Sequence, residues 1–472
     1  MTSKEKLIGY YRSQLSENIC QTPWIVATDV LVGSVRFAEE LRELGAKKVL
    51  AIGARRGVGD ISEDIPTINL DIGSSQSMLN GILEGEEALE NVPDWAAQIV
   101  NEFDPNHEAR AVRAFFSTDK PIVGRPVFGA RKPSWAALED KMIVDALWDE
   151  IGIPRAPRKL VRLDDPDIFQ QSASLDQGEG VVWVGDNRDS WHGGAERTRW
   201  VRTKKEQEEA RAFLAQYCDQ IRIMPFLDGI PCSIHGWVFP EKTIAFRPCE
   251  MLVFQCEDSR FFYAGAATNW KPREDIRAAM ADAAIRAGEH LRKIVGYRGA
   301  FTIDGVVTKD GFFPTELNPR FGGAISRMAT SIPRLPLLLL HFATMEALDM
   351  EWFPDQLREL VVSEAEAHPQ IRGMILLEGV FDLQDDKIHF VPEEDGWKEV
   401  EEVEEVEEVE KRKELSSAIV GAAASGSLIF IHIHPSHIAF GKSAASTILS
   451  AASFVSKIWD VELPKLRPAR EI

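Results

Sequence analysis

The sequence is poor in cysteine, and its few cysteines follow no metal-binding or disulfide pattern. Only five occur in 472 residues, and no two have the spacing of a CxxC motif. They are Cys20, Cys218, Cys232, Cys249 and Cys256. An odd number without such spacing excludes a disulfide framework and a zinc-finger signature, and it favours a reducing compartment.

Long hydrophobic runs are also missing. The first twenty residues, MTSKEKLIGYYRSQLSENIC, contain no continuous apolar core of the signal-peptide type. The most apolar later segments, 335–340 and 418–431, are shorter than the roughly 20 residues that a membrane-spanning helix needs. We therefore expect a soluble, cytoplasmic protein without a membrane partner.

Basic runs are absent too, although the chain is strongly charged. The formal net charge is −20, and eight of the acidic residues lie in one tract, Glu399 to Glu410. Without a basic face we expect no nucleic-acid partner. The acidic tract, 399–411, repeats every three residues, which fits neither a helix nor a strand. We expect a solvated insertion there and assign it no function.

The length indicates more than one packed unit. A chain of 472 residues exceeds what one hydrophobic core usually organises, and 44% hydrophobic with 27% charged residues is ordinary for a globular protein. At the N-terminus two strand-like runs, 24–32 and 47–53, flank an amphipathic helical pattern that stops at Gly45. This alternation predicts an open α/β unit.

The second of those strands ends in AIGARRGVGD, which raises the alternative of a dinucleotide site. Glycines after a strand let backbone amides approach a pyrophosphate. The glycines here are Gly53, Gly57 and Gly59, and their spacing does not match GxGxxG. We favour a plain strand-to-loop turn, and an NAD-dependent oxidoreductase is a weak alternative.

The middle of the chain mixes helices and strands without regular alternation. Helical patterns at 133–152, 204–217 and 273–295 are separated by strand-rich sequence. The segment GAFTIDGVVTKDGFFPTELNPR then predicts a hairpin that turns at 309–311. We therefore expect an α+β unit.

The second strand of this hairpin carries the clearest candidate chemistry. Side chains alternate along a strand, so Pro314, Glu316 and Asn318 are expected to share one face. The first strand brings Asp304 opposite them. Two carboxylates and an amide oxygen suit Mg²⁺, which usually keeps substrate phosphates in its coordination shell. The alternative is structural: Glu316 pairs with Arg320 while Asn318 begins a turn.

These residues carry a resemblance. The stretch GYRGAFTIDGVVTKDGFFPTELNPRFGGA resembles the metal-binding hairpin of the ATP-grasp superfamily. The resemblance implies that Asp304, Glu316 and Asn318 hold the magnesium ions that bridge the β- and γ-phosphates of ATP. It also implies that Arg320 faces the transferred phosphoryl group or the acyl phosphate.

The resemblance further implies the fold class and the division of the chain. We expect an open α/β preATP-grasp domain over 1–132 and an ATP-grasp fold of two α+β subdomains over 133–348. A small C-terminal α/β region, 349–472, would contain the acidic tract and shows no motif that we can assign.

Other segments are similar to further ATP-grasp elements. ALEDKMIVDALWDEIGIPRAP resembles the opening element, so Lys141 would contact ATP, although an exposed helix lysine is the alternative. RIMPFLDGIPCSIHGWVF resembles the adenine-lining strand and linker. Its hinge would be Pro225, Phe226 and Leu227, and an ordinary core strand is the alternative. The glycine-rich lid would be RDSWHGGAERTRW, with Gly193 and Gly194.

A basic residue often contacts phosphate between the hinge and the hairpin, and Arg247 in FRPCEML occupies that place. A guanidinium binds carboxylate or phosphate with two parallel hydrogen bonds. We expect Arg247 either to contact phosphate as a catalytic residue or to form a structural ion pair.

The pattern departs from the family at the nucleotide end. A second ATP lysine is expected at the end of VVWVGDN, where Val184 and Gly185 stand instead. The missing charge would come from one of three arginines, and the acid that often recognises adenine is replaced near Met224. The three arginines are Arg188, Arg197 and Arg199.

The segments FGARKPSWAALEDK and PCSIHG are similar to the branch related to the pheganomycin-type peptide ligase. This resemblance implies an ATP-dependent carboxylate–amine ligase that forms an amide through an acyl phosphate. Its substrates would be small molecules of the amino-acid or peptide kind, and a homodimer is compatible with it. Another ATP-grasp ligase, a carboxylase-type enzyme and a noncatalytic nucleotide-binding homologue are the alternatives.

The segment FIHIHPSH offers a competing metal site near the C-terminus. His432 and His434 share a strand face and His437 follows, but no carboxylate or cysteine is near them in sequence. We favour an ordinary strand and leave these histidines out of the magnesium site.

Overall fold

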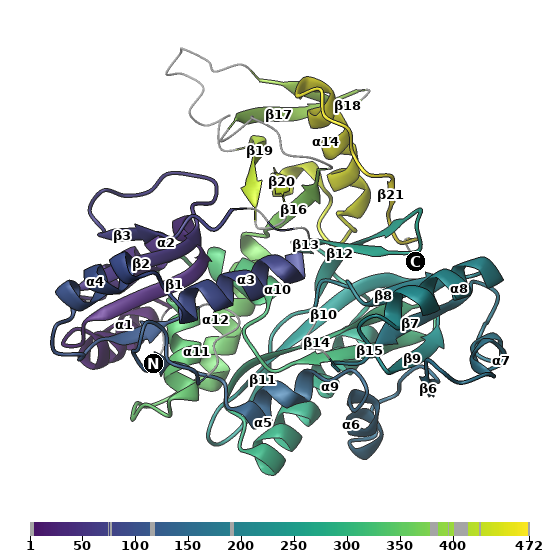
Figure 1. The fold of residues 1–472 in the computed structure, drawn as a ribbon, viewed down its shortest axis with the longest axis horizontal. Coiled ribbons are helices and arrows are strands. Elements are labelled where there is room, and N and C mark those ends of the chain that lie inside the picture. Colours follow the sequence, from purple (N-terminus) through teal and green to yellow (C-terminus); the bar gives the residue numbers. More distant parts are fainter. Residues whose placement is uncertain are drawn as a thin grey trace.

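The computed structural model describes residues 4–73, 75, 78–113, 119–188, 193–377, 386–394, 396–400, 414–423 and 426–470. Within these residues the strands form three sheets, of five, four and twelve strands (Figure 1). Helices cover the five-stranded sheet and lie along the largest one. The predicted mixture of an open α/β unit with α+β units is confirmed.

The N-terminal unit is a parallel sheet with the strand order β3-β2-β1-β4-β5. Its strands are β1 (Trp24–Val30), β2 (Val49–Arg55), β3 (Thr67–Asn69), β4 (Arg110–Val112) and β5 (Val127–Phe128). Its helices are α1 (Lys4–Ile19), α2 (Leu31–Glu43), α3 (Met78–Glu90) and α4 (Asp94–Phe103). Apolar side chains are buried on both faces of this sheet, as expected for a parallel sheet that helices cover on both sides.

The glycines of AIGARRGVGD are explained by close packing in this unit. Strand β1 runs directly into α2, and a Cβ on Gly53 would lie 2.5 Å from the Cα of Leu31. A Cβ on Gly57, whose φ is +76°, would lie 2.1 Å from Val30 Cγ1. These glycines therefore allow β2 and its loop to approach the start of α2, and they need no dinucleotide to explain them.

A linking segment follows, which the periodicity predicted as one helix over 133–152. The structure has three short pieces instead: α5 (Pro133–Ala136), the 3-10 turn η1 (Ala137–Glu139) and α6 (Val144–Glu150). The backbone N–H of Met142 donates to Asp140 Oδ1 at 2.9 Å, so the Asp140 side chain closes a turn that ends the helix. Lys141 lies in this interruption.

The four-stranded sheet is antiparallel, in the order β6-β9-β7-β8. Its strands are β6 (Lys159–Arg162), β7 (Val181–Gly185), β8 (Thr198–Val201) and β9 (Gln220–Pro225). One face packs on α7 (Ile168–Ala173) and α8 (Lys204–Leu214) around the buried Trp183. The other face, which carries Val182 and Val184, is turned toward the large sheet and lines a cavity.

The large sheet runs from the predicted hairpin into the C-terminal region. Its order is β15-β14-β10-β12-β13-β16-β20-β19-β17-β18, with β11 beside β10 and β21 beside β12. The strands are β10 (Ile230–Val238), β11 (Thr243–Ala245), β12 (Cys249–Cys256), β13 (Phe261–Ala267), β14 (Gly299–Thr308), β15 (Gly311–Asn318), β16 (Ile371–Leu376), β17 (Lys387–Glu393), β18 (Gly396–Glu399), β19 (Ser416–Ala423), β20 (Gly426–Ile433) and β21 (Leu466–Arg467).

Two hydrophobic cores lie along this sheet. Helix α9 (Glu274–Val295) packs on β10 and β14, while α11 (Leu337–Met345) and α12 (Pro354–Ala367) connect the sheet to α1. Helix α14 (Ala445–Ile458) packs on the C-terminal strands. Helix α10 (Gly323–Thr330) packs on β13. Because β13 pairs with β16, the sheet continues across residue 348, where we placed a domain boundary.

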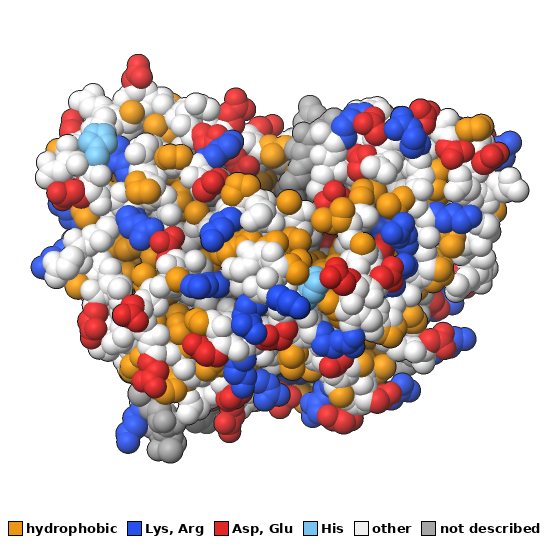
Figure 2. Space-filling view, turned by 90° about the horizontal axis from the view of Figure 1, so that it is seen from below, with side chains coloured by type: hydrophobic (Ala, Val, Ile, Leu, Met, Phe, Trp, Pro, Cys, Tyr) orange, Lys and Arg blue, Asp and Glu red, His pale blue; other side chains and the backbone are white. Residues whose placement is uncertain are grey.

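Two further expectations concern the surface and the acidic tract. On the face in Figure 2 the basic and acidic side chains are interspersed rather than gathered into a band of one sign. No helix in the described part of the chain is long and apolar enough to cross a bilayer. Of the acidic tract, 399–411, only residues 399 and 400 are described, and 401–411 lie outside the described residues.

Candidate active site

A cavity of about 570 Å³ lies between the inner face of the four-stranded sheet and the strands β10, β12, β14 and β15. This volume is within the range of sites for small molecules and cofactors. One end is apolar and the other carries charged side chains. The cavity contains every metal-ligand candidate and most of the other candidates from the sequence.

The predicted hairpin forms the charged end. In β14 and β15, Asp304 lies opposite Glu316 and Thr302 lies opposite Asn318. Directly opposite residues share a sheet face, and these four side chains line the cavity. The hairpin and the approach of Asp304 to Glu316 are therefore confirmed, whereas the metal-binding role of these residues stays a prediction.

The predicted alternation along β15 is wrong at one residue. The register shifts between Asp304 and Gly305, so that Gly305 pairs with Pro314 and Thr315 is an extra residue. Because of this bulge, Pro314 does not share the face of Glu316, and Thr315 lines the cavity instead. A Cβ on Gly305 would lie 2.5 Å from the Phe313 carbonyl oxygen, so the bulge requires glycine there.

The two carboxylates influence each other strongly. Burial and the nearby charge of Glu316 raise the pKa of Asp304 to about 7, against the opposing effects of Arg320 and Lys141. Asn318 Nδ2 donates to Asp304 Oδ2 at 2.8 Å. Lys141 Nζ, presented by the interruption of the helix, donates to Glu316 Oε1 at 3.0 Å. The arrangement is a pair of partly buried acids beside the cations Lys141 and Arg320.

Arg320 is oriented by a carboxylate that the sequence analysis did not identify. Its Nε donates to Glu139 Oε1 at 2.8 Å, and its Nη2 donates to Asn318 Oδ1 at 2.8 Å. Arg131 Nη1 donates to the same Glu139 oxygen at 2.6 Å. Burial would raise the pKa of Glu139, but Arg320 and Arg131 outweigh it and hold the pKa below its usual value. Glu139 is therefore charged and fixes Arg320 beside the acids.

A row of neutral polar groups continues the same sheet face. Ser233 lies opposite Asp304, and His235 lies opposite Thr302. His235 is 1% exposed, and its two ring nitrogens are hydrogen-bonded to the hydroxyls of Thr302 at 2.9 Å and Ser233 at 3.1 Å. Burial lowers the pKa of His235 to about 3, so the ring is neutral. It supports the floor of the site without adding charge.

A third cation, after Lys141 and Arg320, reaches the cavity from the four-stranded sheet. Arg222 lies opposite Val184, where a family lysine was expected, and both line the cavity. Its Nε and Nη2 donate to the two oxygens of Asp145 at 2.7 Å each, and its Nη1 donates to the carbonyl of the bulged Thr315 at 2.9 Å. Arg222 thus connects both sheets to α6.

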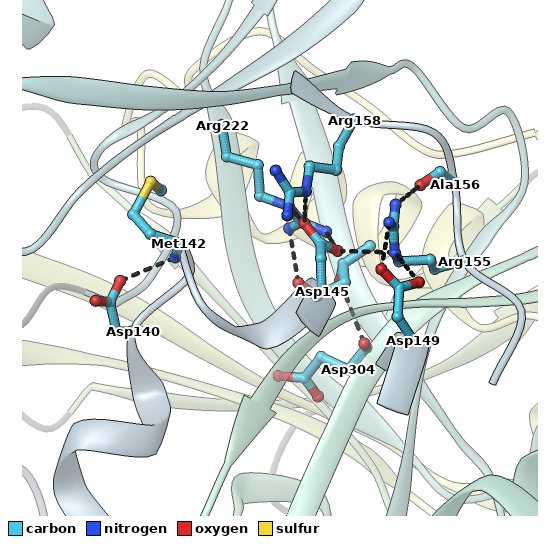
Figure 3. A network of polar contacts seen from close by, with 10 residues as sticks. Asp140, Met142, Asp145, Asp149, Arg155, Ala156, Arg158, Arg222 and Asp304 are labelled. Carbon is cyan, nitrogen blue, oxygen red and sulfur yellow. Dashed lines mark hydrogen bonds and ion pairs between the residues drawn. The ribbon is translucent and has the colours of Figure 1, made fainter. Parts of the chain in front are cut away.

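Figure 3 shows how Arg222, Arg158 and Arg155 converge on Asp145. Arg158 Nε lies 3.2 Å and Arg155 Nε 3.9 Å from the Asp145 oxygens. Arg155 also pairs with Asp149 at 2.8 Å. One fully buried carboxylate therefore faces three guanidinium groups, and the local charge at this wall of the cavity is positive.

The apolar end contains the predicted hinge. Pro225, Phe226 and Leu227 line the cavity together with Met224. The Phe226 ring stacks on Trp200, with centroids 4.4 Å apart and planes at 20°, and lies parallel to Phe261. Gly193 and Gly194 also line the cavity, at the edge of the described residues of the lid. The parallel rings of Phe226 and Phe261 line this apolar slot and are suited to stack on a planar ring.

Residues 184–324 match the family model described as "ATP-grasp domain". The matched segment includes the hinge, the hairpin and Arg320, and it begins at the strand where the lysine is missing. The chain carries an ATP-grasp domain. No curated protein matches the chain in sequence.

Solved structures share the fold over nearly the whole chain. The L-amino acid ligase from Bacillus licheniformis has a TM-score of 0.52 and 13% identity, covering 94% of this chain and 99% of that chain. N5-carboxyaminoimidazole synthase from Aspergillus clavatus, in complex with ADP and its ribonucleotide, has a TM-score of 0.51 and 10% identity, covering 93% and 100%.

The biotin carboxylase domain of the 2-oxoglutarate carboxylase from Hydrogenobacter thermophilus, in complex with MgADP, ADP and bicarbonate, has a TM-score of 0.52 and 11% identity. It covers 94% of this chain and 91% of that chain. At these identities the similarity establishes the fold alone. The resemblance to the branch of the pheganomycin-type ligase stays a prediction.

In the ATP-grasp domain, the three arginines proposed for the missing lysine all lie away from the cavity. Arg188 pairs with Asp219 at 3.1 Å on the surface. Arg197 lies over the Tyr217 ring and Arg199 over the Phe213 ring, both on the helix-covered side of the sheet. The expectation was wrong because Arg199 lies opposite Trp183, on the face turned away from the cavity, whereas Arg222 lies opposite Val184.

Arg247, predicted either to contact phosphate as a catalytic residue or to form a structural ion pair, is not among the residues that line the cavity. Its Nη2 donates to the Trp270 carbonyl at 3.0 Å, its Nη1 lies 4.0 Å from Glu366, and its guanidinium faces the Phe440 ring. Burial lowers its pKa. The loop after β11 turns Arg247 toward α12 and the C-terminal region, which favours the structural alternative.

The competing histidines lie elsewhere. His434 is bonded to Ser436 at 2.7 Å and His437 to Ser416 at 3.0 Å, while burial and the nearby Arg372 lower the pKa of His432 to about 4. In the part of the chain that the structure describes, no three His, Cys, Asp or Glu side chains gather as a metal site. The hairpin supplies two carboxylates, and its third oxygen donor is the amide of Asn318.

Proposed function

We propose that the protein is an ATP-dependent carboxylate–amine ligase, which forms an amide through an acyl phosphate and releases ADP and phosphate. The observation that carries this proposal is the pairing of Asp304 with Glu316 on the cavity floor, with Arg320 fixed beside them and a flat apolar slot at the other end. A nucleoside triphosphate has the matching form, with a planar base and a metal-bound phosphate tail.

The donor set of the hairpin fits magnesium. For a metal, Asp304, Glu316 and Asn318 offer oxygen donors, and a bound cation would offset the burial and the repulsion from Glu316 that raise the pKa of Asp304. These residues would hold Mg²⁺, with phosphate oxygens completing its shell as is usual for this ion. When bound, magnesium would neutralise charge on the β- and γ-phosphates.

Lys141 and Arg222 are the remaining cations of the cavity, and both are placed to bind phosphate groups. Adenine would lie in the slot between Phe226 and Met251, with the triphosphate running along the cavity toward the hairpin. Lys141 and Arg222 would contact the phosphates, and Arg222 would replace the lysine that family members carry on the neighbouring strand. Lys141 would leave Glu316 as the metal arrives, because both positive groups bind the same carboxylate.

The chemistry follows from this placement. A substrate carboxylate oxygen attacks the γ-phosphorus, the bond to the bridging oxygen breaks, and ADP leaves. An amine then attacks the acyl carbon, phosphate leaves with the electrons of the C–O bond, and the nitrogen loses a proton. Arg320 would stabilise the charge that develops on the transferred group and on the carbonyl oxygen.

Closure over the site would protect the acyl phosphate from water. The described end of the lid already contacts the N-terminal unit, because the backbone N–H of Leu79 at the start of α3 donates to Glu196 at 3.1 Å. Ile82 of the same helix lines the cavity. The N-terminal unit and the lid would therefore close the site together.

Several finer assignments belong to the same proposal. The substrates would be small molecules of the amino-acid or peptide kind, and the enzyme would act in the cytoplasm, as a monomer or a homodimer. The L-amino acid ligase of similar fold supports this choice, whereas the similar carboxylases support the alternative of a carboxylase-type enzyme. The domain limits 1–132, 133–348 and 349–472 are part of the proposal.

The test is a product analysis. Purified protein with Mg-ATP and pooled amino acids or short peptides should release ADP, and a product should form whose mass equals two substrates less water. Both should disappear in Glu316→Gln. Release of AMP and pyrophosphate would overturn the proposal. ATP binding without turnover on any carboxylate–amine pair would favour the noncatalytic alternative, which the apolar Val184 at the lysine position supports.

A further inference from the structure

Three arginines from three parts of the chain lie beyond the charged end of the cavity, and Arg327 and Arg36 both act on the charge of Arg372. Arg327 comes from α10, Arg372 from β16 and Arg36 from α2. Helix α10 packs on β13, next to β16 (Figure 1). Arg36 Nη2 lies 3.5 Å from the position of a Cβ on Gly59, so the loop after β2 borders the group.

The register of the large sheet connects this group to the cavity. Met251 lines the cavity and pairs with Ala266, which pairs with Arg372, which in turn pairs with His432. Paired residues share a face, so Arg372 and His432 continue the cavity face of the sheet. The opposite face of the same strands is apolar and packs on α14. The face that lines the cavity thus continues through Ala266 to the polar side chains of Arg372 and His432.

The arginines of this group have no acidic partner. Among the described residues no carboxylate forms an ion pair with Arg36, Arg327 or Arg372, whereas Arg222 and Arg320 each have one within 3 Å. Arg372 Nε is buried without a hydrogen-bond partner, and Arg372 Nη2 reaches only Gln370 Oε1 at 3.5 Å. Burial, then repulsion from Arg327 and Arg36, lowers the pKa of Arg372. Half-buried guanidinium groups without an anion are costly to maintain.

Tyr263 is close enough to both the hairpin and the group to feel the charges of Asp304 and Arg327. Tyr263 of β13 lines the cavity, and its hydroxyl lies 3.1 Å from the position of a Cβ on Gly323, at the start of α10. Burial raises the pKa of Tyr263 to about 12, with Asp304 and Arg327 acting on it in opposite directions. Tyr263 is therefore a neutral donor between the proposed metal site and Arg327.

We propose that Arg327 and Arg372, with Arg36 at the rim, bind an oxyanion carried by the amine substrate, either a carboxylate or a phosphate. Guanidinium groups bind both with two parallel hydrogen bonds. The oxyanion would anchor one end of the substrate while its amino group faces the acyl carbon beside Arg320. The assignment to the amine substrate rests on the proposed function, whereas the binding of an oxyanion does not.

Binding measurements on the full chain test this site separately from turnover. The nucleotide site is first saturated with Mg²⁺ and a nonhydrolysable ATP analogue, so that phosphate probes cannot enter it. Two matched pairs of amines are then titrated calorimetrically: glycine against glycinamide, and phosphoethanolamine against ethanolamine. Within each pair only the oxyanion differs. The variants are Arg327→Met and Arg372→Met, with Arg273→Met as control, because Arg273 is exposed and immediately precedes α9.

We expect the amine with the oxyanion to bind more tightly in at least one pair. Each of the two variants should weaken that binding about tenfold or more, as expected for a charged hydrogen bond, and should leave the binding of the ATP analogue unchanged. A preference for glycine over glycinamide would identify the bound oxyanion as a carboxylate. A preference for phosphoethanolamine over ethanolamine would identify it as a phosphate. Arg273→Met should behave as the unmodified protein. A thermal melt of each variant reports whether the fold is retained.

Three results separate the possible failures. Equal binding within both pairs, while the ATP analogue binds, would overturn the oxyanion site and leave the proposed ligase function standing. A preference that survives both arginine variants would also overturn it. If the ATP analogue does not bind, the proposed function fails. The probes are then titrated without nucleotide, and a preference lost in both variants would still establish the site.

Discussion

Glu139 is a carboxylate that orients Arg320, and its removal tests that role. Glu139→Gln leaves the shape but takes the negative charge from two guanidinium groups, those of Arg131 and Arg320. We expect kcat to fall by about tenfold to a hundredfold, because an anchored charge acts on the transition state, while KM for ATP changes little.

The control is Glu108→Gln, which removes an exposed glutamate of the N-terminal unit. Steady-state ADP release gives both constants. A rise in KM for ATP with an unchanged kcat would mean that Glu139 supports nucleotide binding and not the chemistry at Arg320. A lower melting temperature is expected in either case, because buried guanidinium groups lose their partner.

Arg222 replaces the missing lysine in our account, and this can be measured directly. Arg222→Met should raise KM for ATP about tenfold or more, the usual effect of losing one charged hydrogen bond. Arg188→Met is the matched control, because Arg188 pairs with Asp219 on the surface, and it should change KM less than twofold. Similar effects of the two substitutions would contradict the assignment.

At the residue scale, part of this site could be predicted from the sequence. Asp304, Glu316, Asn318 and Arg320 lie close together in the chain, so strand alternation and one tight turn place them. Glu139 and Arg222 could not be found this way, because they reach the site from other elements. The one available signal for Arg222 was its place in a strand whose facing neighbour, Val184, lacks the expected charge.

At the scale of the element, hydrophobic periodicity predicted some helices and strands better than others. It failed for 133–152, where the side chain of Asp140 closes a turn, and at Thr315, where a bulge inserts one residue. Both are local hydrogen-bonding choices that a hydrophobic pattern does not record. Both also matter for the site, since the first presents Lys141 and the second places Thr315 against Arg222. Both departures from regular secondary structure therefore lie at the wall of the cavity.

Helix α2 provides a prediction at the scale of the element. Burial and, to a smaller extent, Glu43 raise the pKa of Glu40 from 4.5 to about 7. The folded state then holds a proton that the unfolded chain releases above pH 4.5, so the free energy of unfolding decreases as the pH rises toward 7. Above pH 7 this contribution is constant.

Urea denaturation at pH 5.5 and 7.5 measures the effect. The loss of stability between these pH values should be smaller in Glu40→Gln than in the unmodified protein, by roughly 1–2 kcal/mol. Glu63→Gln, which removes an exposed glutamate, is the control for the change in net charge. An identical pH dependence in all three proteins would refute the shifted pKa of Glu40.

The molecule as a whole brings its C-terminal segment back to the nucleotide end. Strand β21 pairs with β12, Ala469 lines the cavity, and Arg470 lies 3.1 Å from Asp228 beside the hinge. Deleting residues 464–472 should therefore open the apolar slot and raise KM for ATP several-fold. Arg470→Gln should raise it less than about twofold, because exposed ion pairs contribute little.

Nucleotide titration of the truncated and full-length proteins measures this difference. An unchanged affinity in the truncated protein would mean that the segment only rests on the sheet. This contact joins residues about 240 positions apart in the chain. The sequence analysis assigned the C-terminal region no role at the site, because no motif marks a segment that contributes through backbone pairing and one small side chain.

The central claim is that phosphoryl transfer to a substrate carboxylate precedes amide formation. An oxygen-18 label follows that step. The carboxylate substrate found in the product screen is labelled in both oxygens and turned over with Mg-ATP and its amine, and the released phosphate is examined by mass spectrometry. We predict one labelled oxygen in each phosphate released with product. Unlabelled phosphate, or AMP with pyrophosphate, would contradict the account.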